Sequence, residues 1–196
     1  MAGEYPYKHI VDRTLKIAFK PSEFWAETSQ ENVTASECFL RYLLVIQAIP
    51  AAATFLGLVL FGYSAGPLGS VSVPIGRALG AGITAYVQGL AAVGLAGWLA
   101  SFLAPKFGGA SSLDRGITLM TMAFLPAAAA GILMLVPSLS LLSGLVGLYS
   151  LYLAWVGIGP MMGIPDDRKV PYAVVLFLAA VLIVSLFTVM SRKAVW

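Results

Sequence analysis

The sequence predicts an all-α integral membrane protein, a bundle of five transmembrane helices preceded by a short interfacial N-terminal segment. Hydrophobic residues make up 59% of its 196 residues and charged residues only 11%, whereas a soluble domain has about 25% charged residues. Several apolar runs reach about 20 residues, the length that crosses the hydrocarbon core of a bilayer. The formal net charge of +3 comes from residues scattered among the loops, so it does not indicate nucleic-acid binding.

Residues 1–38 are expected to form a cytoplasmic segment with short amphipathic elements, and residues 39–196 the transmembrane domain. Residues 8–20 mix apolar and basic positions, and Pro21-Ser22-Glu23-Phe24-Trp25 opens a second short element. Both elements suit the cytoplasmic surface of a membrane. Phe24 and Trp25 have two interpretations that remain open: an anchor in the headgroup layer, or a cap packed before the first span.

Five apolar runs without a charge in their middle follow, each long enough to cross about 30 Å at about 1.5 Å per residue. Their ranges are about 39–62, 79–104, 117–136, 139–161 and 171–190. Capping-box spacing precedes the first run, with Thr34 as the capping residue, and the third run, with Ser111. Pro50 and Pro126 lie inside these two runs, where each removes a backbone hydrogen bond and is expected to kink its helix.

The connections between the runs predict how the chain threads the membrane. Residues 63–77 are turn-rich and are expected to be a plain loop, with re-entry into the membrane as the open alternative. The third and fourth runs are joined only around residues 136–138, so their helices must be antiparallel neighbours. If the N-terminus lies inside and the C-terminus outside, only three of the 12 basic residues fall on the outer side: Arg77, Arg192 and Lys193. This distribution follows the positive-inside rule and predicts a multi-pass protein with a cytoplasmic N-terminus.

Small side chains are expected to mark the helix contacts, because membrane helices associate mainly through close packing. A row at helical spacing in the second run consists of Ala81, Ala85, Gly89 and Gly97. A longer row in the fourth run consists of Ser140, Ser143, Gly147, Ser150, Ala154 and Gly157. The second and fourth helices are therefore predicted to lie at the centre of the bundle. The sequence leaves open whether these rows pack within one chain or between copies.

No ionisable residue lies in the middle of any run, which disfavours a proton relay or a pump for charged substrates. Serine and threonine at this depth commonly bond to their own helix, whereas Gln47 and Gln88 are expected to bridge helices or to line a polar pathway. The residues assigned to such a pathway or to helix contacts are Gln47, Gln88, Thr84, Ser143 and Ser150.

The densest charge cluster, between the fourth and fifth runs, consists of Asp166, Asp167, Arg168 and Lys169. Helix capping and positive-inside anchoring explain it best, and contact with a cytoplasmic partner is the alternative, because two carboxylates offer few oxygens to a metal ion. His9 is the single histidine and Cys38 the single cysteine, and no catalytic or phosphate-binding motif occurs. We therefore expect no enzyme activity, no catalytic or metal-binding residue and no cofactor.

A series of motifs in the second half of the chain is spaced as in a known family. It comprises Phe107-Gly108-Gly109, Ala123-Phe124-Leu125-Pro126, Val136-Pro137, Gly147-Leu148-Tyr149-Ser150-Leu151-Tyr152, Gly157 and Lys169. With Pro21-Ser22-Glu23-Phe24-Trp25 before the first span, this order resembles the Yip family, the Ypt/Rab-interacting membrane proteins, from about residue 20 to the end. The resemblance implies a five-span bundle with a cytoplasmic N-terminus and no enzyme activity.

The resemblance also bears on partners. Eukaryotic members of the family act with small GTPases in vesicle trafficking and membrane shaping, but this chain lacks the Asp-Leu-Tyr-Gly-Pro stretch of many of them. It resembles the prokaryotic branch, which implies a location in the cytoplasmic (inner) membrane. A small GTPase partner is therefore not expected. We expect a protein that organises membrane lipids or partner proteins, including further copies of itself. Two alternatives stay open: a small channel or transporter for an ion or uncharged solute, and a subunit that is stable only in a larger complex.

Overall fold

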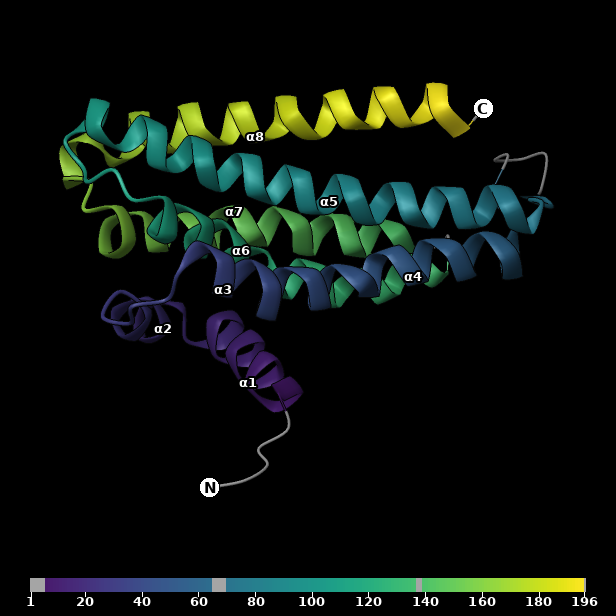
Figure 1. The fold of residues 1–196 in the computed structure, drawn as a ribbon, viewed down its shortest axis with the longest axis horizontal. Helices are drawn as coiled ribbons and strands as arrows, with labels where there is room; N and C mark the ends of the chain where they lie inside the picture. The colour runs from purple at the N-terminus through teal and green to yellow at the C-terminus, as the bar shows by residue number, and fades with distance from the viewer. Residues whose placement is uncertain (1–5, 65–69, 137–138, 196) are drawn as a thin grey trace.

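The computed structural model describes residues 6–64, 70–136 and 139–195, most of which are helical. Long helices run side by side along the length of the molecule, and two short N-terminal helices pack near one end of them (Figure 1). Five helices in the described ranges are long and apolar enough to cross a membrane: Ala35–Phe61, Ile75–Phe107, Leu113–Leu135, Leu141–Met162 and Asp166–Phe187. The predicted all-α class and the five spans are therefore confirmed.

The described elements follow one another in a simple order. The N-terminal helices are α1 (Pro6–Phe19) and α2 (Pro21–Thr28). The first spanning helix consists of α3 (Ala35–Cys38), the π-helical turn η1 (Phe39–Leu43) and α4 (Leu44–Phe61). The others are α5 (Ile75–Leu103) with the 3₁₀ turn η3 (Ala104–Phe107), α6 (Leu113–Ala130) with the 3₁₀ turn η4 (Gly131–Leu135), α7 (Ser140–Met162) and α8 (Asp166–Val195). The predicted spans lie inside these helices or overrun them by one residue.

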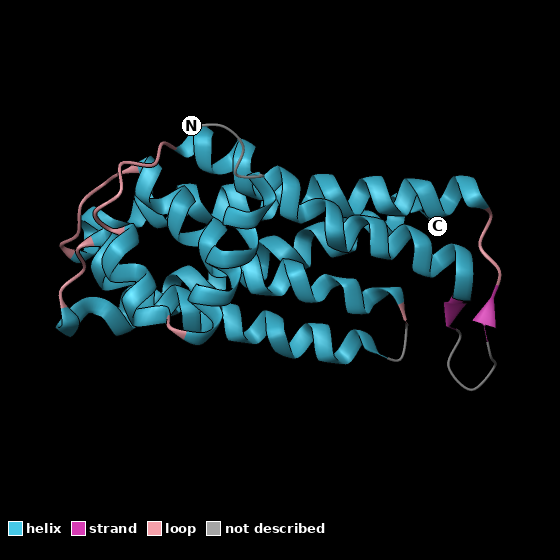
Figure 2. Ribbon diagram, turned by 90° about the horizontal axis from the view of Figure 1, so that it is seen from below, coloured by secondary structure: helices cyan, strands magenta, loops and turns pink. Residues whose placement is uncertain are grey.

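The connection after α4 contains a short hairpin instead of a plain loop. Strand β1 (Tyr63–Ser64) pairs antiparallel with β2 (Ser70–Val71), at the opposite end of the molecule from α1 and α2 (Figure 2). Gly62, at φ 71°, turns the chain out of α4, and a Cβ atom there would lie 2.4 Å from the Val71 carbonyl oxygen. Residues 65–69, on which the question of membrane re-entry depends, lie outside the described residues.

Among the described residues, side chains cap the N-termini of α3 and α6, and the second cap differs from the prediction by one residue. Thr34 Oγ1 accepts a hydrogen bond from the Glu37 amide at 3.2 Å, as its capping-box spacing predicts. For α6, however, the capping residue is Ser112, which accepts from the Arg115 amide, and not Ser111. Asp114 Oδ1 accepts from the Ala35 amide at 2.6 Å instead. The carboxylate that suggested a local capping box therefore caps the neighbouring spanning helix.

The most buried span is α6, whereas the sequence predicts α5 and α7 at the centre. Helix α5 does pack against α4, α6 and α8, but α7 is one of the two least buried spans, so the prediction is wrong for α7. In the most apolar window of each span, 56% of the α6 residues are buried, against 39% for α5 and 28% for α7. Glycines of α5 and α6 make a close crossing. A Cβ atom at Gly116 of α6 would lie 2.3 Å from the Gly97 carbonyl oxygen of α5, so the two helices cross almost backbone to backbone. Small residues let helices approach closely, but they do not decide which helix is surrounded.

Both membrane prolines lie inside helices, Pro50 in α4 and Pro126 in α6. Pro50 packs against Gly131, where an added Cβ atom would come within 2.6 Å of the proline Cβ. Soon after Pro126 the α-helical pattern gives way to the 3₁₀ turn η4. The bending of either helix remains a prediction from the missing backbone donor.

Candidate functional site

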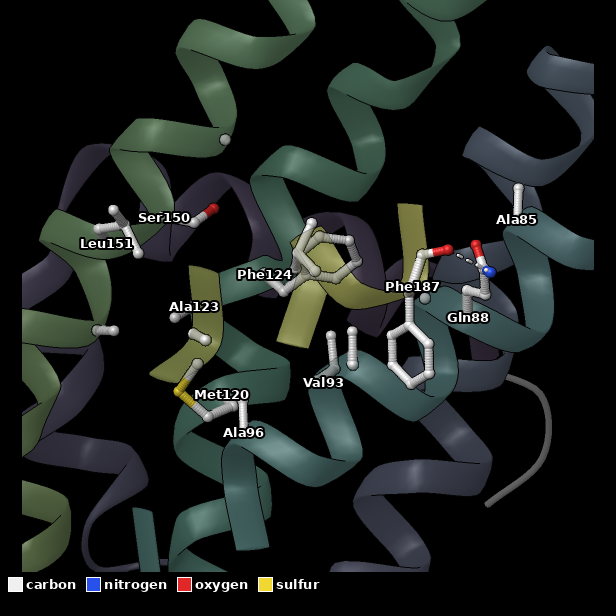
Figure 3. Close-up of a pocket in the computed structure, with 16 residues that line it drawn as sticks. Ala85, Gln88, Val93, Ala96, Met120, Ala123, Phe124, Ser150, Leu151 and Phe187 are labelled. Carbon is white, nitrogen blue, oxygen red and sulfur yellow. Dashed lines mark hydrogen bonds between the residues drawn. The ribbon is translucent and has the colours of Figure 1, made fainter. Parts of the chain in front are cut away.

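The strongest candidate site is a cavity of about 380 Å³ between α5, α6, α7 and α8 (Figure 3). On α5 its wall runs from Ala85 to Ala96, in the middle part of that helix, which places it near the midplane of a bilayer. Small side chains from all four helices leave the space open: Ala85, Gly89, Ala92, Ala96, Ala123, Gly147, Ala154 and Ala180. The rows of small residues thus partly pack against neighbouring helices and partly border a void.

Two polar side chains, Gln88 and Ser150, line this otherwise apolar cavity. Gln88 Nε2 donates a hydrogen bond to the Phe187 carbonyl oxygen at 2.9 Å and so ties α5 to α8, as the dashed line in Figure 3 shows. The Ser150 hydroxyl is buried and has no hydrogen-bond partner within the described part of the chain. The cavity therefore offers little to a charged or strongly polar solute.

The other residues assigned to a polar pathway lie elsewhere. Gln47 is 4% exposed and donates from Nε2 to the Ala85 carbonyl oxygen at 3.3 Å, which ties α4 to α5. It lies directly over Gly89, where a Cβ atom would come within 1.9 Å of its amide nitrogen. Thr84 is half-buried and Ser143 is buried, and neither lines the cavity. Of the five residues, the structure therefore brings together only Gln88 and Ser150.

The N-terminal segment docks on the bundle through Trp25. Its side chain is fully buried, and Nε1 donates to the Leu153 carbonyl oxygen of α7 at 2.9 Å. A Cβ atom at Gly157 would lie 2.6 Å from the indole ring, so this glycine makes room for it. Tyr149 of α7 donates from its hydroxyl to the Ala18 carbonyl oxygen at the end of α1. Of the two interpretations of Phe24 and Trp25, the packed cap is therefore the one the structure supports.

Ion pairs hold α1 against α2 and the residues after it. Arg13 pairs with Glu31, Lys16 with Glu27, and Lys20 with Glu23. The Arg13 guanidinium also lies over the rings of Phe24 and Tyr42, 5.9 and 5.5 Å from their centroids. Burial lowers the pKa of Arg13, but the hydrogen bond to Glu31 and nearby groups raise it above its ordinary value overall. The charge of Arg13 therefore persists at any physiological pH. Because the ion pairs and ring contacts join α1 to α2, these two helices form one connected unit, the α1–α2 unit.

Helix α1 has two apolar surfaces side by side. Ile10 and Ile17 are buried, in a helix that packs against α2 and α6. Val11, Leu15 and Phe19, each one turn apart, are 55%, 52% and 80% exposed. We call these three residues the α1 ridge. An exposed phenylalanine beside an already satisfied buried face is typical of a helix that meets lipid.

The charge cluster predicted from the sequence forms the first turn of α8. Asp166 and Asp167 occupy its N-terminal turn, where negative charge is favourable to the helix dipole. Lys169 lies with Nζ 5.0 Å from the centre of the Trp155 ring of α7. Arg168 lies near Gly108, where an added Cβ atom would be 3.6 Å from its Nη1. The cluster thus packs where α7, α8 and the turn after η3 meet.

Part of the cavity wall could not be found from the sequence. Val184 and Phe187 of α8 form one side of it, yet this helix is apolar on every face in the sequence. A helix that is apolar all round gives no signal of which side faces protein and which faces lipid. Gln88 was the one clue to this side, because a membrane glutamine needs a partner on another helix.

A comparison with protein families matches residues 15–188 to the family described as the Yip1 domain. The matched region begins within α1 and ends in α8, so it contains α2, the docking site of Trp25 and the cavity. No curated protein and no solved structure matches the chain significantly.

Proposed function

The chain belongs to the Yip1 domain family, and from this premise we propose that it is a non-enzymatic membrane protein that organises the lipids around it. We place it in the cytoplasmic (inner) membrane, as its resemblance to prokaryotic members implies. Its N-terminus lies inside, because nine of its 12 lysines and arginines are then on the cytoplasmic side. In this orientation α1 and α2 lie at the cytoplasmic surface. The α1 ridge then faces the inner leaflet.

The α1 ridge is the observation that supports the proposal most strongly. All three of its side chains are more than half exposed, and Phe19 is the most exposed, at 80%. Full burial of such a side chain contributes about 1.5–3 kcal/mol, and insertion among the acyl chains gains the share that corresponds to its exposed fraction. Because Trp25 and Tyr149 fix the α1–α2 unit to the bundle, the inserted side chains hold their place in the leaflet. A fixed wedge of this kind spreads the neighbouring headgroups and changes lipid packing.

Replacing Val11, Leu15 and Phe19 together with glutamine tests the proposal. Glutamine keeps a good helix propensity but removes the apolar ridge. We expect wild-type protein to shift the emission of Laurdan, a probe of headgroup packing, in vesicles of phosphatidylethanolamine and phosphatidylglycerol. The triple variant is expected to give a much smaller Laurdan shift. Wild type and the triple variant are compared at equal protein content, so that the rest of the protein surface contributes equally to both.

The matched control is Asp12→Gln, which changes an exposed polar residue of the same helix and is expected to behave as wild type. Circular dichroism of each variant checks that the bundle has formed. An equal Laurdan shift for wild type and the triple variant would refute a lipid-organising role of the α1 ridge.

The position of the cavity favours one second candidate, a small channel or transporter, because Gln88 lines a void near the midplane. We expect Gln47→Leu and Gln88→Leu to remove helix bridges, each lowering the free energy of unfolding by about 0.6 kcal/mol and at most about 1.7 kcal/mol. Thermal unfolding in detergent measures this.

A flux assay separates this candidate from the lipid-organising role. In sealed vesicles that contain the protein, flux of cations, anions and small solutes should equal that of protein-free vesicles. A protein-dependent flux that the double variant abolishes would establish transport instead.

A further inference from the structure

We infer that the cavity between α5, α6, α7 and α8 is the binding site for one apolar tail of a membrane lipid. Protein interiors are close-packed and hold few voids larger than a water molecule. A volume of about 380 Å³ lies instead in the range of ligand pockets, about 300–1,000 Å³. The cavity is therefore large enough to hold a ligand, and it is partly open to its surroundings.

The lining of the cavity points to a hydrocarbon chain. Alanine, glycine, valine, leucine, methionine and phenylalanine make up all of it except Gln88 and Ser150. The Gln88 amide nitrogen is committed to the Phe187 carbonyl oxygen, and no lining residue carries a charge. Water or a polar solute would lose hydrogen bonds on entering such a site, whereas an alkyl chain gains contacts with its walls.

A helix from a second copy of the chain is the other occupant to consider, and the experiment below separates it from a lipid tail. An α-helix with its side chains is about 10–12 Å across, whereas a single extended alkyl chain is much thinner.

The surroundings of the cavity give a tail a route from the bilayer. Helix α8 is the least buried span, with 17% of its most apolar window buried, and it packs mainly on α5 and less on α7. Exposed apolar side chains flank the cavity wall on both helices, Leu148 at 63% on α7 and Val181 at 54% on α8. The apolar surface therefore continues from the lipid-facing side of α7 and α8 toward the cavity. Lipid tails surround these helices at high concentration, so occupancy needs only modest affinity.

Photolabelling tests the site directly. The probe is a phosphatidylcholine with a diazirine in the middle of one acyl chain, present in trace amounts in vesicles that contain the full-length protein. After irradiation, mass spectrometry maps the labelled residues. We expect adducts at Ala96, Ala123 and Ala154, which are at most 3% exposed but line the cavity, in addition to adducts on exposed side chains.

A cavity-filling variant and a matched control show whether the buried alanines are labelled from within the cavity. Ala180→Phe places a ring in the cavity and should abolish labelling of the three buried alanines, while labelling of exposed residues persists. Val181→Phe adds a ring at the next residue, on the exposed face, and should leave every adduct in place. Ala123→Leu provides a second filling variant should Ala180→Phe not fold. The inference is overturned if wild-type adducts are confined to exposed side chains, or if the filling variants label the buried alanines as strongly as wild type.

This inference extends the proposed lipid-organising role but rests on different residues. The Laurdan shift, measured on the same vesicles, depends on the α1 ridge and should survive Ala180→Phe. Loss of cavity labelling with an intact Laurdan shift in this variant supports a separate tail site. Cavity labelling in a protein that gives no Laurdan shift keeps the tail site and refutes the lipid-organising role of the α1 ridge.

Discussion

Replacing Trp25 with alanine is expected to lower the free energy of unfolding by about 3–5 kcal/mol, the usual cost of removing a fully buried aromatic side chain. The indole is 0% exposed, stands edge-on to the Phe24 ring and donates a hydrogen bond to α7. Its loss leaves a cavity beside Gly157, which cannot fill the space. Thermal unfolding in detergent, followed by near-ultraviolet circular dichroism, measures the effect.

Trp98→Ala is the control for this experiment. Trp98 is 52% exposed and stacks on Phe102, so its removal should change the free energy of unfolding by about 0.5 kcal/mol or less. If Trp25→Ala and Trp98→Ala unfold at the same temperature as wild type, the N-terminal unit contributes nothing to the stability of the bundle, and its docking on α7 is wrong.

The second large effect is expected from Gly116→Ala at the crossing of α5 and α6. The added Cβ atom would lie 2.2 Å from Ser101 Oγ and 2.3 Å from the Gly97 carbonyl oxygen. The serine side chain can turn away, but the carbonyl belongs to the backbone of α5, so the two helices must separate. Overpacking of this kind costs about 1–3 kcal/mol. The same unfolding measurement, with the yield of monodisperse protein, checks it.

Gly80→Ala is the matched control, because nothing lies within 4 Å of the position that its Cβ atom would take. Alanine is a better helix former than glycine, so this variant should be as stable as wild type or up to about 1 kcal/mol more stable. Equal stability of the Gly116→Ala and Gly80→Ala proteins would contradict the close crossing of α5 and α6.

The spanning helices could be predicted from the sequence because long apolar runs without charge are a property of consecutive residues. The tertiary arrangement was less accessible. Gly116 did not belong to a long row of small residues, yet it makes the closest approach to Gly97, while much of the long row in α7 borders the cavity or faces Trp25. Spacing along one helix identifies a smooth face but not the partner that covers it.

The candidate site was predictable only where a residue cannot be satisfied locally. Gln47 and Gln88 were expected to reach another helix, and each does. Their directions were not predictable, because they depend on which helix packs on each side of α5. The ion pair of Arg13 with Glu31 was missed for a similar reason, since neither residue has a helical-spacing partner that would reveal it.

The hydrogen bonds of the N-terminal region impose an order on biosynthesis. The Leu153 carbonyl that receives the Trp25 indole lies 128 residues later in the chain, and Tyr149 lies 131 residues after Ala18. Asp114, which caps Ala35, lies 79 residues after it. A ribosome therefore releases α1 and α2 long before their docking surface exists. Helix α1 can pack on α6 once the third span exists, but the hydrogen bonds of Trp25 and Tyr149 can form only after the fourth span has been synthesised.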